Sequence, residues 1–288
     1  MNLTDPNEIK ALMAANGVHF SKSLGQNFLI AAWVPEKIAE SADLHENDGV
    51  LEIGPGVGVL TRELSERAAE VVSIELDESL APILRVTLMD RENCHVVYGD
   101  ALKQDLPALC RAYFGEERAW KLCANLPYNV TTPLLTAILE SGAFETVTVM
   151  IQKEVAERIC AEAGTGEYGA FTLLVNWYAT AEKLFDVSPD CFLPQPKVTS
   201  SVIRLRRRRE AAAEVSDVPW FFKVVRAAFN QRRKALPNAL SAGLGIDKSA
   251  VTGALTALGL RADIRGERLT LEQFAALSEI LKKSQKSA

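Results

Sequence analysis

The sequence predicts an α/β protein: a mainly parallel sheet forms the larger part, and a small C-terminal helical domain follows it. Three observations predict this. Short apolar runs alternate with helix-like stretches over much of the 288 residues, and the tail lacks strand-like alternation. Hydrophobic residues make up 48% and charged residues 24%, as in ordinary globular proteins. Regular alternation of strands and helices indicates crossover units on a parallel sheet.

The expected strands are short apolar runs bounded by turn residues. Five of them are expected to be buried in the sheet, at 49–54, 70–76, 94–100, 121–126 and 146–152. Stretches with helix-like spacing lie between them, at 57–68, 78–89 and 131–142. Two later segments, 171–188 and 198–207, are expected to be strands that complete the same sheet.

A change of composition after Arg209 predicts a domain boundary. Residues 210–219 are expected to be a linker, and the stretches beyond it have helical spacing. Thr270 and Gln273 stand at the separation of a capping box at the start of the last helix. We therefore expect a sheet domain over residues 1–209 and a helical domain over residues 210–288.

Bulk composition excludes several classes of protein. There is no apolar run of about 18 residues, so no membrane span is expected. The N-terminus lacks the pattern of a secretory signal, and the cysteine usage fits a reducing cytoplasm. Five cysteines without a CxxC pair, and only three histidines, argue against a zinc site. No metal is expected.

Charge is unevenly distributed along the chain. The net charge of −5 argues mildly against a nucleic-acid partner, yet arginines cluster at 204–209 and basic residues recur at Arg226 and 232–234. Local patches decide phosphate binding, rather than net charge. For the 204–209 cluster, a solvated strand face and a phosphate contact remain open alternatives.

A glycine-rich turn, "LEIGPGVGVL", follows the first expected strand. Gly54, Gly56 and Gly58 allow a sharp turn and the close approach of a ligand to the backbone. The alternatives are a plain strand-to-helix turn and a dinucleotide site. Dinucleotide sites space their glycines as GxGxxG, however, and here the third glycine of that pattern is replaced by Val59.

Two carboxylates at the ends of the next strands indicate an adenosyl ligand. Glu75 ends the second strand, where it can accept both ribose hydroxyls, and Asp100 ends the third, where it can accept an adenine amino group. S-adenosylmethionine has a ribose and an adenine but no pyrophosphate. A site with several carboxylates therefore favours S-adenosylmethionine over a nicotinamide dinucleotide.

The fourth strand ends in Asn125-Leu126-Pro127-Tyr128, beside the expected cofactor. Adenine N6 is a poor nucleophile, and two acceptors on its N–H bonds would turn its lone pair towards a methyl group. The Asn125 side-chain oxygen and the Leu126 carbonyl can supply them. Pro127 restricts the backbone, and Tyr128 offers a face on which an extruded base can stack.

Six motifs resemble the bacterial ribosomal RNA adenine N6,N6-dimethyltransferases, from about Ser21 to the end of the chain. They are "SLGQNFL" (23–29), "LEIGPGVGVLT" (51–61), "NLPYN" (125–129), "QKEVAERI" (152–159), "FLPQPKV" (192–198) and "FNQRRKAL" (229–236). The resemblance implies a Rossmann-like, S-adenosylmethionine-dependent methyltransferase domain with a helical RNA-recognition domain. It also implies dimethylation of two adjacent adenosines in the 3′-terminal hairpin of 16S rRNA, in the immature small subunit.

The resemblance also assigns residues. Asn27, Leu29, Gly54, Glu75, Asp100 and Asn125 are expected to contact S-adenosylmethionine. Phe192 is expected to stack on the other face of the target adenine, and Arg232, Arg233 and Lys234 are expected to contact RNA. A monomer that does not bind membranes is expected. The alternatives are an adenine methyltransferase acting on 23S rRNA or DNA, a dinucleotide-binding oxidoreductase, and a non-enzymatic ribosome-assembly factor.

Overall fold

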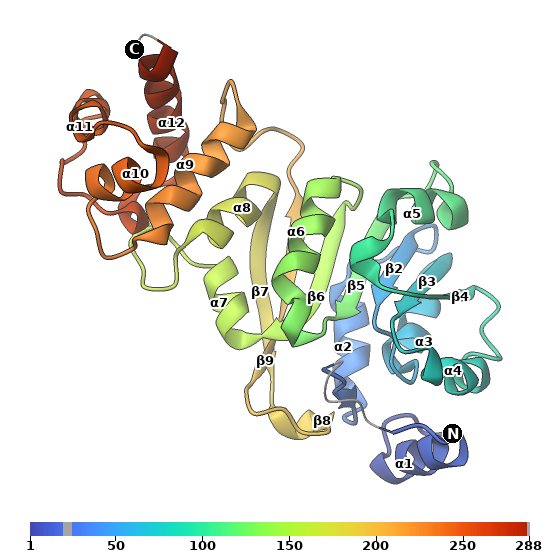
Figure 1. Ribbon diagram of the computed structural model, residues 1–288. Coiled ribbons are helices and arrows are strands. Elements are labelled where there is room, and N and C mark those ends of the chain that lie inside the picture. The colour runs from blue at the N-terminus through green and yellow to red at the C-terminus, as the bar shows by residue number, and fades with distance from the viewer. Residues whose placement is uncertain (20–24, 287–288) are drawn as a thin grey trace. The chain divides into compact units, whose positions relative to one another are not determined.

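A seven-stranded sheet organises the first part of the chain in the computed structural model, which describes residues 1–19 and 25–286 (Figure 1). The strand order is β4-β3-β2-β5-β6-β9-β7. Strands β2 to β6 are parallel to their neighbours, whereas β9 is antiparallel to β6. The bounds are β2 Gly49–Ile53, β3 Glu70–Glu75, β4 Cys94–Tyr98, β5 Trp120–Asn125, β6 Thr146–Gln152, β7 Ala179–Val187 and β9 Ser200–Arg207.

The prediction of five parallel strands is confirmed, with every end within two residues of its expected place. Every residue of β2 is buried, and so are five of the six in β3. Strands covered on both faces read as continuous apolar runs, which is why composition alone located them. The predicted strand at 198–207 is also confirmed, as β9.

The prediction of a strand over the whole of 171–188 is wrong in its first half. Residues Ala170–Tyr178 form the helix α8, and β7 begins only at Ala179. The "FTLLVNWY" run is almost wholly apolar, so its periodicity cannot separate a helix from a buried strand. The Gly169 N–H donates to the Thr172 hydroxyl at 3.0 Å, which fixes the first turn of the helix.

Helices cover both faces of the sheet. Helices α2 (Trp33–Ser41) and α3 (Val59–Ser65) share an apolar cluster with Val50 of β2. Helix α5 (Leu106–Phe114) lies on the opposite face, because side chains alternate along a strand and its Phe114 packs over the neighbouring Gly49. A Cβ atom on Gly49 would lie 2.3 Å from that ring, so this position requires glycine. The other elements here are α1 Pro6–Ala15, α4 Ala81–Thr87, α6 Thr131–Ser141, α7 Lys153–Ile159 and the strands β1 Phe28–Leu29 and β8 Phe192–Leu193.

The chain divides into two compact units. The first is Met1–Ala156 with Ala181–Arg207, and the second is Glu157–Thr180 with Arg208–Ala288. The segment containing α8 thus joins the second unit, whereas the sequence placed it within 1–209. None of the helices within the described residues is long and apolar enough to cross a membrane.

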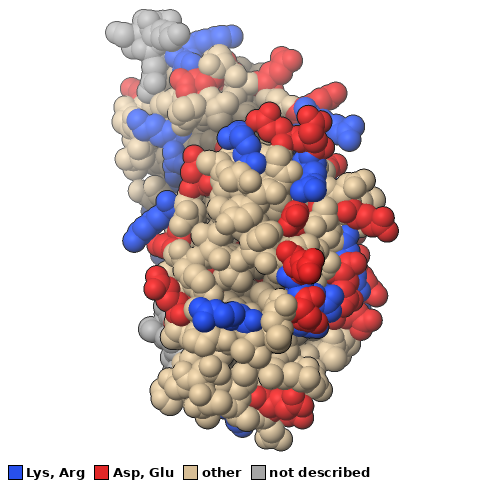
Figure 2. Space-filling view, turned by 90° about the vertical axis from the view of Figure 1, so that its right-hand side faces the viewer, with Lys and Arg blue, Asp and Glu red and all other residues tan. Residues whose placement is uncertain are grey.

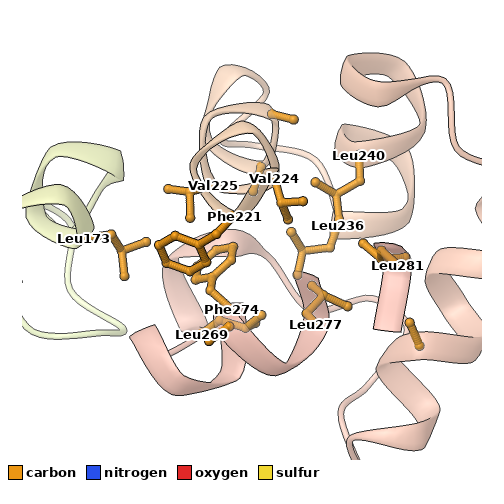
Figure 3. Close-up of a cluster of buried hydrophobic side chains, with 14 of the residues drawn as sticks. Leu173, Phe221, Val224, Val225, Leu236, Leu240, Leu269, Phe274, Leu277 and Leu281 are labelled. Carbon is orange, nitrogen blue, oxygen red and sulfur yellow. The ribbon is translucent and has the colours of Figure 1, made fainter. Parts of the chain in front are cut away.

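The second unit is helical around its own apolar core, as Figure 3 shows. Leu173 of α8 packs there with Phe221 of α9 and Phe274 of α12. The predicted capping box is confirmed: the Thr270 N–H donates to Gln273 Oε1 at 3.0 Å, and the Gln273 N–H donates to the Thr270 hydroxyl at 3.3 Å. The bounds are α9 Val218–Asn230, α10 Leu236–Leu244, α11 Lys248–Ala257 and α12 Leu271–Lys286.

Candidate active site

One cavity lies where the parallel strands end, within the first unit. All six residues expected to contact the cofactor line it, together with four of the five expected catalytic residues. These lining residues are Asn27, Leu29, Gly54, Glu75, Asp100, Asn125, Leu126, Pro127 and Tyr128. The carboxyl ends of neighbouring parallel strands meet at one edge of a sheet, and this topology brings the residues together. Ser23 and Leu24 of the first motif lie outside the described residues.

The glycine turn between β2 and α3 forms the floor of the cavity. Gly54, Gly56 and Gly58 have φ values of 75°, 59° and 89°, which L-residues with side chains rarely adopt. A Cβ atom on Gly56 would also lie 2.9 Å from the ring of Phe28. The turn therefore needs glycine for its backbone and for the close approach of the segment 25–29.

Glu75 presents a buried carboxylate at the end of β3, and its side chain is only 6% exposed. Its Oε1 accepts the Asp77 N–H at 2.8 Å, and its Oε2 accepts the Gly56 N–H at 3.3 Å. Burial raises the pKa of this carboxyl, and the two N–H donors partly offset the rise. The backbone thus fixes a carboxylate that retains further acceptor capacity for a pair of hydroxyls.

Asp100 and Leu102 line the cavity beyond β4, and Leu76 lines it beyond β3. Asp100 caps the short 3₁₀ turn Ala101–Lys103 by accepting the Leu102 N–H at 3.0 Å through Oδ1. Its Oδ2 lies 3.8 Å from the ammonium of Lys103, which is itself largely exposed. Leu76 is 53% exposed and Leu102 is 40% exposed, yet both line the cavity. Two apolar side chains beside a carboxylate suit a flat base with an amino group.

The orientation of Asn125 is set from outside its own strand. Its Nδ2 donates to the main-chain carbonyl of Asn27 at 3.3 Å. An amide whose nitrogen is engaged in this way directs its oxygen elsewhere as an acceptor. Nearby, the carbonyl of Pro127 accepts both the Val130 N–H, at 3.2 Å, and the Thr131 hydroxyl, at 3.0 Å.

Tyr128 and Phe192, the two expected stacking residues, are placed differently. Tyr128 lines the cavity, and its hydroxyl lies 2.5 Å from Ser200 Oγ. Burial raises the pKa of the Tyr128 hydroxyl, so it stays protonated at neutral pH. Phe192 is 2% exposed, packs in the apolar cluster with Leu29 and Cys191, and is not among the cavity-lining residues. Its role in stacking stays a prediction.

Glu52 is a buried carboxyl that the sequence analysis missed. It is 1% exposed, lines the cavity, and accepts the hydroxyls of Thr61 at 2.6 Å and Ser73 at 2.7 Å through Oε2. Burial raises its pKa to about 7, and the nearby Glu75 adds to the rise. A charged residue within the otherwise apolar run "VLEIG" was the signal that could have identified it.

The three basic residues expected to contact RNA belong to the second unit. Arg232 donates through Nη2 to the carbonyl of Tyr168 at 2.9 Å and also to that of Gly166, so it ties its own unit together. Arg233 and Lys234 are exposed. The sequence did not distinguish these two surface cations from an arginine with structural contacts.

Basic side chains in the first unit are largely paired with acidic ones. Arg62 lies 2.6 Å from Asp90, Arg91 lies 2.7 Å from Glu66, and both are on the side where α3 and α4 lie in Figure 1. Figure 2, which views that side, shows acidic and basic side chains intermingled. In the 204–209 cluster, Arg204 pairs with Glu182 and Arg206 with Asp43, each at 2.8 Å. Arg207 and Arg208 instead donate to main-chain carbonyls.

The fold and the cavity together are those of an S-adenosylmethionine-dependent methyltransferase. A sequence model of the family described as "Ribosomal RNA adenine dimethylase" matches residues 17–283. The chain belongs to this family. The buried Glu75 carboxylate and the exposed apolar walls fit the ribose and adenine of the methyl donor that the family uses.

Individual relatives support the same family assignment. The chain is 46% identical to the ribosomal RNA small subunit methyltransferase A of Clostridium acetobutylicum over 90% of this chain and 93% of that protein. It is 43% identical to that of Shouchella clausii, with 97% and 96% covered. Among solved structures it is similar to the 23S rRNA methyltransferase ErmE, with a TM-score of 0.68, 30% identity, and 89% and 100% covered. A dimethyladenosine transferase from Plasmodium falciparum shares the fold, with a TM-score of 0.72, 24% identity, and 90% and 98% covered.

The family settles the class of reaction. The chain is an enzyme, an S-adenosylmethionine-dependent rRNA adenine dimethyltransferase, and S-adenosylmethionine is its methyl donor. The dinucleotide-binding oxidoreductase is thereby excluded as an alternative.

Proposed function

We propose that this enzyme dimethylates N6 of two adjacent adenosines in the 3′-terminal hairpin of 16S rRNA, within the immature small ribosomal subunit. Identities of 43% and 46% to proteins named for the small subunit, against 30% to a 23S rRNA methyltransferase, support this choice of RNA. The orientation of the Asn125 amide, held by the Asn27 carbonyl, carries the chemical part of the proposal.

The methyl donor is held by residues at the ends of β2, β3 and β4. Glu75 accepts hydrogen bonds from the ribose hydroxyls, Asp100 accepts one from the adenine amino group, and Leu76 and Leu102 cover the ring. Bound S-adenosylmethionine supplies a sulfonium methyl group whose carbon a nitrogen nucleophile can attack, so that the C–S bond breaks and S-adenosylhomocysteine leaves. The displacement requires alignment rather than a metal ion, and positioning accounts for most of the rate.

Two acceptors at the end of β5 prepare the target nitrogen. Because Asn125 Nδ2 is engaged by Asn27, its Oδ1 is the atom that can face an adenine N–H. The Pro127 carbonyl is already occupied by Val130 and Thr131, so the Leu126 carbonyl is the neighbouring main-chain acceptor for the second N–H. Held by both, the nitrogen directs its lone pair towards the methyl group. The proton leaves after transfer, so no strong general base is needed.

The remaining assignments are extensions of this proposal. Residues 1–209 bind the donor and catalyse transfer, and residues 210–288 recognise RNA, with Arg233 and Lys234 exposed for phosphate contact. A ribosomal substrate supports a cytoplasmic location, and the proposal includes a monomeric enzyme.

The test is to map the label after incubation with radiolabelled S-adenosylmethionine. The protein is offered small subunits that lack these methyl groups and, separately, 23S rRNA and duplex DNA. We expect label only in 16S rRNA, at two neighbouring adenosines of the 3′-terminal hairpin. Label in 23S rRNA or DNA, with none in the small subunit, would contradict the proposal.

A further inference from the structure

The hydrogen bond between Tyr128 and Ser200 links the catalytic loop to a distant strand. The two oxygens are 2.5 Å apart although the residues are 72 positions apart in the chain. Tyr128 begins the short 3₁₀ turn Tyr128–Val130, which follows β5 after Leu126 and Pro127. Ser200 is the first residue of β9 and is fully buried. One end of the tyrosine therefore belongs to the loop, and the other is attached to the sheet.

Ser200, which anchors the Tyr128 hydroxyl, is held rigidly because β9 is paired with β6 at that residue. Ser200 is opposite Gln152, the last residue of β6, and the Lys153 N–H donates to the Thr199 carbonyl at 3.0 Å just beyond it. Strand β6 lies between β5 and β9. Neighbouring strands are about 4.8 Å apart, so a contact from the end of β5 to β9 has to cross about 10 Å. A long side chain with a terminal hydroxyl can make that contact.

We propose that Ser200 is a positioning residue for methyl transfer, because it fixes the position and long axis of the Tyr128 ring on which the target adenine stacks. The inference rests on the proposed function, in which Tyr128 is the stacking face. A short turn leaves the two side-chain torsions of a tyrosine to local packing. The bond to the sheet holds the hydroxyl at the far end of the ring, and this fixes the direction in which the ring extends from the loop.

The second methylation depends on this anchor more than the first. A monomethylated adenine has one N–H left, so one of the acceptors at Asn125 and Leu126 loses its partner. Stacking is unchanged by the new methyl group and becomes the main restraint on the base. A loose Tyr128 ring should therefore slow the second transfer more than the first, and monomethyladenosine should accumulate.

The experiment compares Ser200→Ala with the matched control Ser201→Ala. Ser201 is also fully buried, but it donates to Asp186 Oδ1 at 2.7 Å, and its side chain points to the opposite face of the strand. We expect Ser200→Ala to lower the single-turnover rate about tenfold, as the loss of one buried hydrogen bond suggests. The dissociation constant for S-adenosylmethionine should not change, and the ratio of monomethyl to dimethyl product should rise. The control should keep the wild-type rate and product ratio.

Tyr128→Phe removes the same hydrogen bond by deleting the tyrosine hydroxyl. It takes the place of Ser200→Ala in the test if that variant does not fold. The double variant should be no worse than the more impaired single variant, because both remove one interaction. Wild-type rate and product ratio in both single variants would overturn the inference, even while the wild-type enzyme makes dimethyladenosine. If the wild-type enzyme failed to methylate adenine at all, the proposed function would fail instead.

Discussion

The cavity at the carboxyl edge of the sheet and the basic segment Arg232–Lys234 hold their functional groups in opposite ways. In the cavity, Glu75 and Asn125 are fixed by main-chain hydrogen bonds from other elements. In the basic segment, Arg233 and Lys234 are exposed. Methyl transfer needs an aligned nitrogen and carbon, which demands fixed geometry. Phosphate binding needs charge within reach, which tolerates mobile side chains.

The contrast between side chains fixed by hydrogen bonds and freely exposed ones also applies within the basic segment, where Arg232 is the fixed residue. It has the same charge as its neighbour Arg233, yet its guanidinium bonds carbonyls of the segment that precedes α8. Removing it would alter the fold of the second unit as well as the charge. All three basic residues are exposed, and Arg232 differs in that its guanidinium also bonds its own unit.

The largest expected effect is that of Asn125→Ala. Loss of a fixed polar group at the reacting atom should lower the single-turnover rate by roughly 10²–10³. Binding of RNA should be unchanged. The matched control is Asn129→Ala, in the same motif but exposed and not among the cavity-lining residues. Near-normal rates for Asn125→Ala at saturating donor would show that the fixed geometry is not used.

Glu52→Gln tests the most buried carboxyl of the cavity. Its folded pKa of about 7 is above the ordinary value of 4.5, so the protonated form stabilises the fold. That contribution is complete below pH 4.5 and is lost as the pH rises through 7. The variant does not ionise, so between pH 4.5 and 8 its free energy of unfolding should rise relative to wild type by up to about 3 kcal/mol. Parallel pH profiles of thermal unfolding would contradict this.

Glu75→Gln should weaken binding of S-adenosylmethionine by about 2 kcal/mol, because a charge-assisted hydrogen bond to the ribose is lost. The pKa of Glu75 is raised, and only the ionised form accepts both hydroxyls. Wild-type affinity should therefore decline as the pH falls through that pKa, whereas the variant should lack this dependence. Calorimetry measures both, with the exposed Glu78→Gln as control. Unchanged affinity would remove Glu75 from the site.

The smallest effects are expected in the basic segment. Replacing Arg233 and Lys234 together by Ala should reduce the slope of log affinity against log salt by about two, one for each phosphate contact. Methyl transfer at saturating RNA should hardly change. Arg232→Ala should instead lower the melting temperature of the second unit. If Arg232→Ala changed only the salt slope, the division within this segment would be wrong.

The sequence predicted the parallel strands and the cavity residues at strand ends because both follow from local patterns, whereas Asn27 and Leu29 were expected only from the family resemblance. Apolar runs located the strands, and Gly54, Glu75 and Asp100 stand at strand ends, where topology alone brings them together. Contacts between distant segments could not be predicted. The bonds from Asn27 to Asn125 and from Tyr128 to Ser200 depend on loop conformation. The burial of Phe192 depends on packing between β1 and β8.

The central claim is that the cavity holds adenine N6 for two successive transfers, and the product tests it most directly. Wild-type protein is incubated with unmethylated small subunits and fresh S-adenosylmethionine, and the digested RNA is followed by mass spectrometry. The account predicts a transient monomethyladenosine signal that gives way to N6,N6-dimethyladenosine at completion. A product that remains monomethylated at long times would contradict it.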